Sequence, residues 1–291
     1  MSASAALDRY DRASAKVSRV VLHEYSTSFG LASLLLAREM RPHIANVYGI
    51  VRVADEIVDG PAHAAGLDAA ARGEVLDRLE DDVRRACAVG YSANPVVHSF
   101  ATTAGRFGIG QDLTGPFFAS MRADLTPVAF TQEMLDEYVY GSAEVIGLMC
   151  LRIFLGGEDT SPDRRARLEH GARRLGAAFQ RINFLRDLAE DQRELGRTYF
   201  PDLPGGRLDD ERKAEITAAV RLDLSAARST LPELPAGARP AVTAALRLFA
   251  ELNRRIERTP AALVVERRVR VPGPTKVRIL VGAMRATERT A

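Results

Sequence analysis

The sequence YGIVRVADEIVD, at Tyr48–Asp59, decides how this chain folds. Its two aspartates, Asp55 and Asp59, are four residues apart, and residues at that spacing lie on one face of an α-helix. At 100° per residue, Tyr48, Arg52 and both aspartates lie within an arc of about 60°. Aliphatic residues occupy most of the remaining circumference. We therefore predict a mostly buried helix whose polar stripe lines a cavity, because buried carboxylates without partners are costly.

The same spacing recurs far along the chain at Asp187 and Asp191. Gln180 and Asn183 lie on the same stripe, within about 80° of these aspartates, and apolar residues again fill the rest of the helix. Carboxylates one helical turn apart repel each other unless a cation lies between them. Their hard oxygen ligands suit Mg²⁺, which takes one or two carboxylates and completes its shell with water and substrate phosphates. The two stripes together predict a diphosphate held between two metal-loaded helices.

An arginine accompanies each acidic pair. Arg52 lies one turn before Asp55, and Arg186 directly precedes Asp187. A planar guanidinium can bind phosphate oxygens in a bidentate manner, which fits a diphosphate site. A single Asp-x-x-x-Asp is more often a solvated helix face with ordinary ion pairs. Two copies on apolar helices, each with its arginine, favour the functional interpretation.

Apolar residues recur at helical spacing through most of the chain, and alternating β-branched runs are almost absent, so we predict an all-α protein. We expect helices at residues 8–25, 28–40, 43–59, 67–89, 93–107, 111–125, 131–155, 161–194, 208–230, 236–258 and 273–287. A short extended piece is expected at Val269–Pro274, where proline and glycine alternate. No low-complexity stretch divides the chain, so we expect one domain over residues 1–291, with 1–8 and 286–291 frayed.

Composition excludes several classes of protein. The chain is 46% hydrophobic and 27% charged, which excludes disorder. Its longest apolar runs, such as Leu31–Ala37, are too short to cross a bilayer, and no signal peptide is recognisable, so a cytoplasmic protein is expected. Cys87 and Cys150 stand apart from any Cys/His cluster, which argues against a zinc site or disulfide framework. The formal net charge of +2 does not indicate a nucleic-acid partner.

With these motifs in place, the chain resembles the squalene/phytoene synthases, which join two prenyl diphosphates head to head. The resemblance extends from about Tyr25 to Lys276 and is most similar to the bacterial phytoene synthases. It rests on STSF at Ser26–Phe29, on YGIVRVADEIVD, on YVYG at Tyr138–Gly141, and on LGAAFQ at Leu175–Gln180 followed by Asn183, Arg186, Asp187 and Asp191.

The resemblance implies an isoprenoid synthase fold, a single-domain helical bundle around a central cavity. It implies Mg²⁺, with Mn²⁺ as the alternative, held by Asp55, Asp59, Asn183, Asp187 and Asp191. Catalytic roles are implied for the four aspartates and for Arg52, Arg186 and Tyr138. Substrate contacts are implied for Tyr25, Ser26, Thr27, Ser28, Tyr48, Arg52, Gln180, Asn183 and Arg186. Six aromatic residues either line a dry cavity or pack in the core: Phe29, Phe117, Phe118, Tyr138, Tyr140 and Phe179.

The implied reaction condenses two geranylgeranyl diphosphates to phytoene through a cyclopropylcarbinyl diphosphate, a step of carotenoid biosynthesis that needs no nicotinamide. The alternative is a squalene or dehydrosqualene synthase that uses two farnesyl diphosphates, because one sequence does not measure cavity depth. A non-catalytic lipid-binding relative should have lost metal ligands. A terpene cyclase acting on one diphosphate usually has a different second metal motif. The four aspartates argue against both of these classes.

Three positions depart from the pattern of this family. Glu144 stands where many members have glycine, and we leave open whether it is a cation partner or part of a structural ion pair. Phe249 replaces a tyrosine of some members. Pro272-Gly273-Pro274 replaces a more basic stretch, so Lys276 is the cation expected to contact diphosphate in this segment. Arg197, elsewhere in the chain, is a second candidate for such a contact.

The C-terminal end of the chain is rich in arginine. The plain interpretation of this bias is a solvated basic tail. Because the expected substrates are amphiphilic and the product is a hydrocarbon, we also expect peripheral association with the inner membrane surface.

Overall fold

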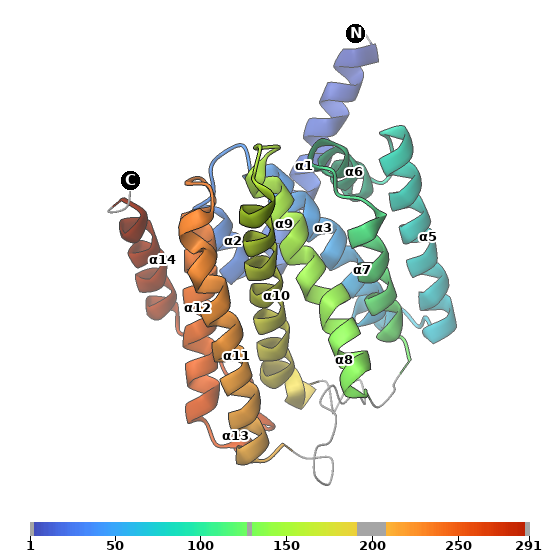
Figure 1. The fold of residues 1–291 in the computed structure, drawn as a ribbon. Helices are drawn as coiled ribbons and strands as arrows, with labels where there is room; N and C mark the ends of the chain where they lie inside the picture. Colours follow the sequence, from blue (N-terminus) through green and yellow to red (C-terminus); the bar gives the residue numbers. More distant parts are fainter. Residues whose placement is uncertain (1–2, 127–129, 191–207, 289–291) are drawn as a thin grey trace.

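The computed structural model describes residues 3–126, 130–190 and 208–288 of the chain (Figure 1). Within these ranges the chain forms helices and connecting turns, and no strand occurs. The all-α prediction is confirmed. An extended piece was expected at Val269–Pro274; residues 268–272 have no regular structure, and α14 begins at Gly273.

The helices follow one another in a simple order along the chain. They are α1 Ala3–Tyr25, α2 Thr27–Ser33, α3 Arg41–Val58, α4 Pro61–Ala64, α5 Ala69–Val89, α6 Pro95–Phe107, α7 Gln111–Ala123, α8 Gln132–Val139, the π-helical turn η1 Tyr140–Glu144, α9 Val145–Leu155, α10 Pro162–Glu190, α11 Asp210–Thr230, the 3₁₀ turn η4 Leu231–Glu233, α12 Arg239–Arg258, α13 Ala261–Val264 and α14 Gly273–Glu288.

Helix ends follow from local side-chain chemistry. The carboxylate of Asp68 accepts a hydrogen bond from the backbone N–H of Ala71 at 2.8 Å and so caps α5. Ser161 plays the same part before Pro162, as its sequence predicted, with its Oγ accepting from Arg164 N at 3.4 Å. Gly90 ends α5 with φ of 77°, in the left-handed region that side chains disfavour.

The helix expected at residues 28–40 is shorter than predicted, because α2 already ends at Ser33. Beyond it the chain turns, and the backbone N–H of Ala37 donates to the carbonyl of Gly237 at 2.8 Å. A Cβ on Gly237 would lie 2.8 Å from Cβ of Ala37. This contact with the connection between α11 and α12 is a tertiary one, so local propensity does not reveal it.

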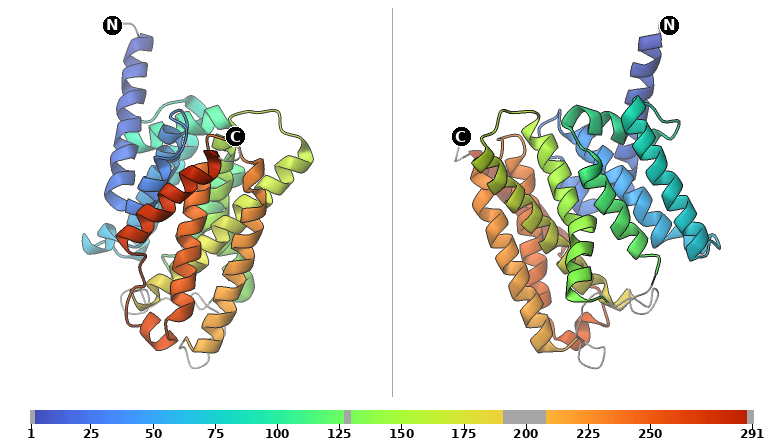
Figure 2. Two further views of the ribbon diagram at one scale, coloured as in Figure 1. Left: turned by 90° about the vertical axis from the view of Figure 1, so that its left-hand side faces the viewer. Right: turned by 45° about the vertical axis from the view of Figure 1, so that its right-hand side comes forward.

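Two hydrophobic cores form the body of the molecule. The first is built from buried residues of α3, α5, α6, α7 and α9, including Phe100 and Phe117. The second is built from α8, α10, α11, α12 and α13, including Ile182 and Ile256. The views in Figures 1 and 2 show these two groups of helices side by side, with α9 and α10 at the centre of the bundle.

Helices at the centre approach each other closely because they meet at glycines. A Cβ on Gly176 of α10 would lie 2.6 Å from the carbonyl oxygen of Ala143 in η1. A Cβ on Gly147 of α9 would lie 2.5 Å from the carbonyl oxygen of Ala172. Both distances are shorter than van der Waals contact, so these backbones can touch only where no side chain intervenes.

One continuous helical stretch, Gln132–Leu155, has the length and composition of a membrane span, with 24 residues. The expectation that no segment is long enough rested on unbroken apolar runs and did not count this mixed stretch. In the fold, 56% of its apolar window is buried. A core helix of a globular protein meets the same criterion, so composition does not distinguish the two.

We predict that Gly141→Ala destabilises the protein by about 2 kcal/mol, because the new methyl group would overpack the junction between η1 and α7. Its Cβ would lie 2.2 Å from both the carbonyl oxygen of Pro116 and Oγ of Ser120. Gly105→Ala in α6 is the matched control, since nothing lies within 4 Å of its Cβ. Urea unfolding should show the control unchanged or stabilised by up to about 1 kcal/mol. Equal effects of the two substitutions would contradict this account of the junction.

Candidate active site

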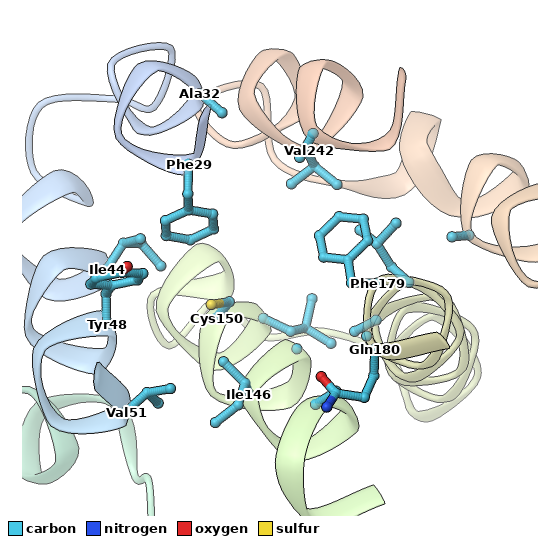
Figure 3. Close-up of a pocket in the computed structure, with 18 of the residues that line it drawn as sticks. Phe29, Ala32, Ile44, Tyr48, Val51, Ile146, Cys150, Phe179, Gln180 and Val242 are labelled. Carbon is cyan, nitrogen blue, oxygen red and sulfur yellow. The ribbon is translucent and has the colours of Figure 1, made fainter. Parts of the chain in front are cut away.

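A cavity of about 420 Å³ lies between the two cores. Figure 3 shows its walls: α2 and α3 on one side, α9 in the middle, and α10 with α12 on the other side. Most of its lining is apolar, from Phe29, Ile44 and Val51 to Ile146 and Val242. A central cavity was expected from the resemblance, and the structure contains it.

The polar lining comes mainly from the two stripes that the sequence singled out. Tyr48, Arg52 and Asp55 of α3 line the cavity. Gln180 and Asn183 of α10 line it as well, and in Figure 3 the Gln180 side chain points inward. The apolar faces of both helices are buried in the cores, as their sequences predicted. Burial of the apolar faces thus turns both polar stripes toward one space.

The first acidic motif is held by Arg52. Its Nη1 lies 2.7 Å from Oδ2 of Asp55, and its Nη2 pairs with Glu56. The guanidinium carbon also lies 4.4 Å from the centre of the Tyr25 ring, a cation–π contact. Arg52 therefore joins the expected residues Tyr25 and Asp55 into one cluster, with Glu56 as an additional member. Asp59 lies one turn further, at the C-terminal cap of α3.

Tyr48 is a half-buried member of this cluster. Burial raises the pKa of its phenol, while Arg52 and a hydrogen bond with Ser26 oppose that shift. Its ring stacks on Phe29, with 5.6 Å between the ring centres. The phenol therefore keeps its proton at neutral pH and can donate a hydrogen bond to an anion. Ser26 also caps α2, with Oγ accepting from Phe29 N at 3.1 Å.

The second acidic motif is paired with two arginines. Nε of Arg186 donates to Oδ1 of Asp187 at 2.9 Å, and its Nη2 binds the other oxygen. Nε of Arg268 lies 2.9 Å from the same Oδ1. Sequence reasoning missed Arg268 and named Lys276 as the cation of this segment. The basic run Arg267-Arg268-Val269-Arg270 was the available signal, but spacing alone does not say which of its members reaches α10.

Asn183 is the clearest polar group without a protein partner in the lining. Its Oδ1 is buried, and among the described residues no donor binds it. It lies one helical turn before Asp187, so its amide oxygen is available to a metal ion or a bound substrate. A buried acceptor left unsatisfied costs free energy, about 1–3 kcal/mol in the usual case. This atom is therefore an observation that favours a ligand in the cavity.

The residues present fit Mg²⁺. The ion prefers carboxylate and amide oxygens, keeps several waters, and needs only one or two carboxylates from the protein. Asp55 and Asn183 line the cavity, with Asp59 and Asp187 each one turn along the same helices. In the part of the chain that the structure describes, no group of three His, Cys, Asp or Glu side chains gathers into a cage. A dedicated all-protein cage is not what this ion requires.

The structure decides between the two roles that the sequence left open for the six aromatic residues. Phe29, Phe117, Tyr138 and Phe179 line the cavity, whereas Phe118 and Tyr140 do not. Phe118 is buried in the first core, where its ring packs against Phe117. Tyr140 lies beside a separate polar cavity, with the Arg173 guanidinium 5.3 Å from its ring centre. The π-helical turn at Tyr140–Glu144 shifts the helix face there, which a regular helical spacing does not anticipate.

Tyr138 and Phe249 each contact one side chain in a defined geometry. The hydroxyl of Tyr138 donates to Oδ2 of buried Asp124 at 2.9 Å. Phe249, which replaces a tyrosine of some family members, stacks on Phe179 with 3.6 Å between ring centres. The ring of Phe249 thus supports the cavity wall from behind.

Some predicted residues lie outside the description. Asp191 and Arg197 belong to residues 191–207, which the structure does not describe. Thr27 and Ser28 begin α2, but their side chains are likewise outside the described part. The predictions for these four residues stay predictions.

Glu144, whose role the sequence left open, is part of a chain of ion pairs in which the carboxylates are buried and the arginines are partly exposed. Its Oε2 lies 2.6 Å from Nε of Arg173, and its Oε1 lies 3.3 Å from Nη2 of Arg174. Arg174 continues to Asp223 of α11 at 3.3 Å, and Arg181 pairs with the same carboxylate. These groups connect η1, α10 and α11 around the separate polar cavity, of about 320 Å³. The structural ion pair is therefore the observed role.

We predict that Glu144→Gln destabilises the protein by about 3 kcal/mol, because it removes a buried charge that two arginines share. Glu158→Gln is the control, since Glu158 forms an exposed pair with Arg164. That exposed pair should contribute less than about 1 kcal/mol. Guanidinium unfolding of both variants compares the two losses. A loss no larger than that of the control would argue against this chain of ion pairs as a structural element.

Comparisons with known proteins identify similar sequences and a similar fold. The family model described as squalene/phytoene synthase matches residues 22–202. Phytoene synthase 3, chloroplastic, of Zea mays is 32% identical over 207 residues, which cover 66% of this chain and 46% of that protein. Phytoene synthase of Arthrospira platensis is 31% identical over 269 residues, which cover 84% of each chain. The chain thus spans about half the length of the maize relative and most of the Arthrospira one.

A crystal structure of a dehydrosqualene synthase in complex with ligand superposes with a TM-score of 0.78 at 20% identity. The match covers 97% of this chain and 99% of that one. At this identity the likeness concerns the fold, and it confirms the predicted isoprenoid synthase fold.

Proposed function

The chain belongs to the squalene/phytoene synthase family, and we propose that it is a prenyltransferase that joins two prenyl diphosphates head to head. The observation that carries the proposal is the division of one cavity into two parts. Carboxylate, guanidinium, phenol and amide groups from α3 and α10 gather in the lining, and apolar side chains form the rest of the wall. An anionic diphosphate fits the first part and a prenyl chain fits the second.

For the substrate we propose geranylgeranyl diphosphate, with phytoene as the product. The maize and Arthrospira relatives, both named phytoene synthases, support this choice. Two farnesyl diphosphates remain the alternative. The relatives match different shares of this chain, and its fold is shared with a dehydrosqualene synthase. The two substrates differ by one isoprene unit, so the length of the apolar wall decides between them.

We propose Mg²⁺ as the cofactor, held by Asp55, Asp59, Asn183 and Asp187 together with Asp191. When bound, the ion neutralises the charge that develops on a departing diphosphate. Mn²⁺ suits the same oxygen ligands. No nicotinamide is required for phytoene, because that product forms by loss of protons and not by hydride transfer.

For binding of the diphosphates we propose Arg52, Arg186 and Arg268. In the structure each pairs with a carboxylate of an acidic motif. A phosphate oxygen is an equally good partner for a guanidinium, so these arginines can contact carboxylate and diphosphate together. Tyr48 donates its phenol hydrogen to the same anion. These contacts strengthen as the carbon–oxygen bond breaks and negative charge moves onto the leaving group.

The apolar wall protects the reacting carbons. Departure of the first diphosphate with its bonding electrons leaves an allylic cation, which the double bond of the second substrate attacks. Loss of one proton closes the cyclopropane ring, and departure of the second diphosphate is followed by rearrangement and loss of another proton. Phe29, Phe179 and Tyr138 line this space and can stabilise cations through their ring faces. Exclusion of water prevents capture of the cations as alcohols.

We also propose a location at the cytoplasmic side of a membrane. The substrates carry an anionic head on a long hydrocarbon chain, and the product is entirely hydrocarbon. Such molecules partition into bilayers, so an enzyme that uses them gains from residing at the surface.

We predict that Asp55→Asn and Asp187→Asn each lower turnover by at least about a hundredfold, because each removes a charge that faces the metal and diphosphate. Asp81→Asn is the matched control, since Asp81 forms an exposed pair with Arg84 on α5. Circular dichroism should show all three variants folded. Turnover by either site variant at the level of the control would reject the metal assignment.

We predict a forty-carbon product when the purified protein is incubated with Mg²⁺ and geranylgeranyl diphosphate. NADPH should not change its yield, and EDTA should abolish it until Mg²⁺ is restored. Mass spectrometry of the extracted hydrocarbons makes the measurement, with farnesyl diphosphate in a parallel reaction. A thirty-carbon product formed preferentially would replace phytoene with squalene or dehydrosqualene, and no product from either substrate would reject the proposed activity.

A further inference from the structure

The C-terminal helix α14 presents an apolar stripe to solvent. Val277, Val281 and Met284 follow one another at helical spacing and are 58%, 40% and 49% exposed. The other side of the helix packs on α12: Ala283 is fully buried, and a Cβ on Gly282 would lie 3.4 Å from Nη1 of Arg247. Single exposed apolar residues are common on protein surfaces, but a row of them on one helix marks an interaction site.

Basic side chains accompany this stripe. Arg278 and Arg285 of α14 are exposed. Lys276, in the first turn of the same helix, is partly exposed. Arg267 and Arg270 are exposed in that preceding segment. The helix itself contains one acidic residue, Glu288, at its last position. Apolar residues on one side and basic residues beside them are typical of helices that lie in the head-group region of an anionic membrane.

The position of α14 connects this surface with the cavity. In the left view of Figure 2, α14 lies in front of the other C-terminal helices, on the outside of the bundle. Helix α12 lies directly behind it and lines the cavity with Ala241, Val242 and Ala245. A membrane on the outer face of α14 would therefore be separated from the prenyl site by two helices, α14 and α12.

We propose that α14 docks the protein on an anionic lipid surface, with the side chains of Val277, Val281 and Met284 inserted at the boundary between head groups and acyl chains. The proposal rests on the proposed function, because amphiphilic substrates and a hydrocarbon product supply the reason for such a surface. It goes beyond that function by naming the face of the molecule that meets the lipid.

The charges favour a lipid surface over a second copy of the chain. A symmetric dimer through this stripe would bring Arg278 and Arg285 close to their own counterparts. Like charges facing each other across an interface oppose association. Anionic head groups have the opposite sign, so the same arginines attract them, by about fivefold in binding for each residue near the surface.

The test is flotation of the full chain with vesicles of phosphatidylglycerol and phosphatidylcholine, compared with vesicles of phosphatidylcholine alone, at low and high salt. The stripe variant is Val277→Asp with Val281→Asp. The control variant, Leu222→Asp with Val89→Asp, changes two residues that are 73% and 72% exposed on other helices. A third variant, Arg278→Glu with Arg285→Glu, tests the charges.

We expect the wild type and the control to float with the anionic vesicles at low salt and to bind less at high salt. The stripe and charge variants should bind at least about tenfold more weakly. Absence of wild-type binding to anionic vesicles, or equal binding of stripe and control variants, would overturn the proposal. Sedimentation measures the oligomeric state of the same proteins. If the wild type is a dimer, the stripe variant is a monomer and neither binds vesicles, the stripe is an interface with a second copy and the proposal is overturned.

The experiment keeps this proposal separate from the proposed function. Turnover of detergent-dispersed geranylgeranyl diphosphate should be the same in the wild type and the stripe variant, because α14 does not line the cavity. Flotation without any turnover by the wild type would reject the enzyme activity and leave the docking surface in place. Turnover without flotation would support the enzyme activity and reject the docking surface.

Discussion

The structure depends on the pairing of carboxylates with arginines on α3 and α10, two helices whose apolar faces are buried. Burying the apolar faces of α3 and α10 in two separate cores turns Asp55 and Asn183 toward the space between them. Charges in such a place need partners, and Arg52 supplies one on α3, as Arg186 and Arg268 do for Asp187. The pair of Arg52 and Asp55 places both signs of charge in the lining of an otherwise apolar cavity, and the pairs of Asp187 lie one turn beyond Asn183, which also lines it. An amphiphilic diphosphate requires such a combination of polar and apolar surface.

The same helices are held in place from behind by a second set of charges and by glycines. The chain of ion pairs from Glu144 through Arg174 to Asp223 connects η1, α10 and α11 on the side away from the main cavity. Gly176 lets the backbone of α10 touch that of η1. Separating these pairs would leave the buried carboxylates of Glu144 and Asp223 without partners, so the pairs favour the observed placement of α10 against η1 and α11.

Polar groups that are paired within the chain and polar groups that are not have different consequences for the structure. Where oppositely charged side chains satisfy each other, as around Glu144, they stabilise helix packing. Where an acceptor such as Asn183 Oδ1 lacks a donor within the described residues, and lines a cavity, it indicates a ligand. The exposed stripe of α14 is the apolar counterpart of that second case, because the partner that we propose for it is a lipid surface.

The sequence by itself determined the helical class, both polar stripes and the arginine beside each, because side-chain spacing along a helix is a local property. Five residues of the predicted stripes, Tyr48, Arg52, Asp55, Gln180 and Asn183, line the cavity, whereas Asp59 and Asp187 lie one turn further along the same helices. Only the tertiary structure decided that Arg268 and not Lys276 reaches Asp187, that Glu144 pairs with Arg173 and Arg174, and that Tyr140 faces away from the cavity. These outcomes depend on a π-helical turn and on contacts between distant segments, and neither is encoded in the spacing of one helix.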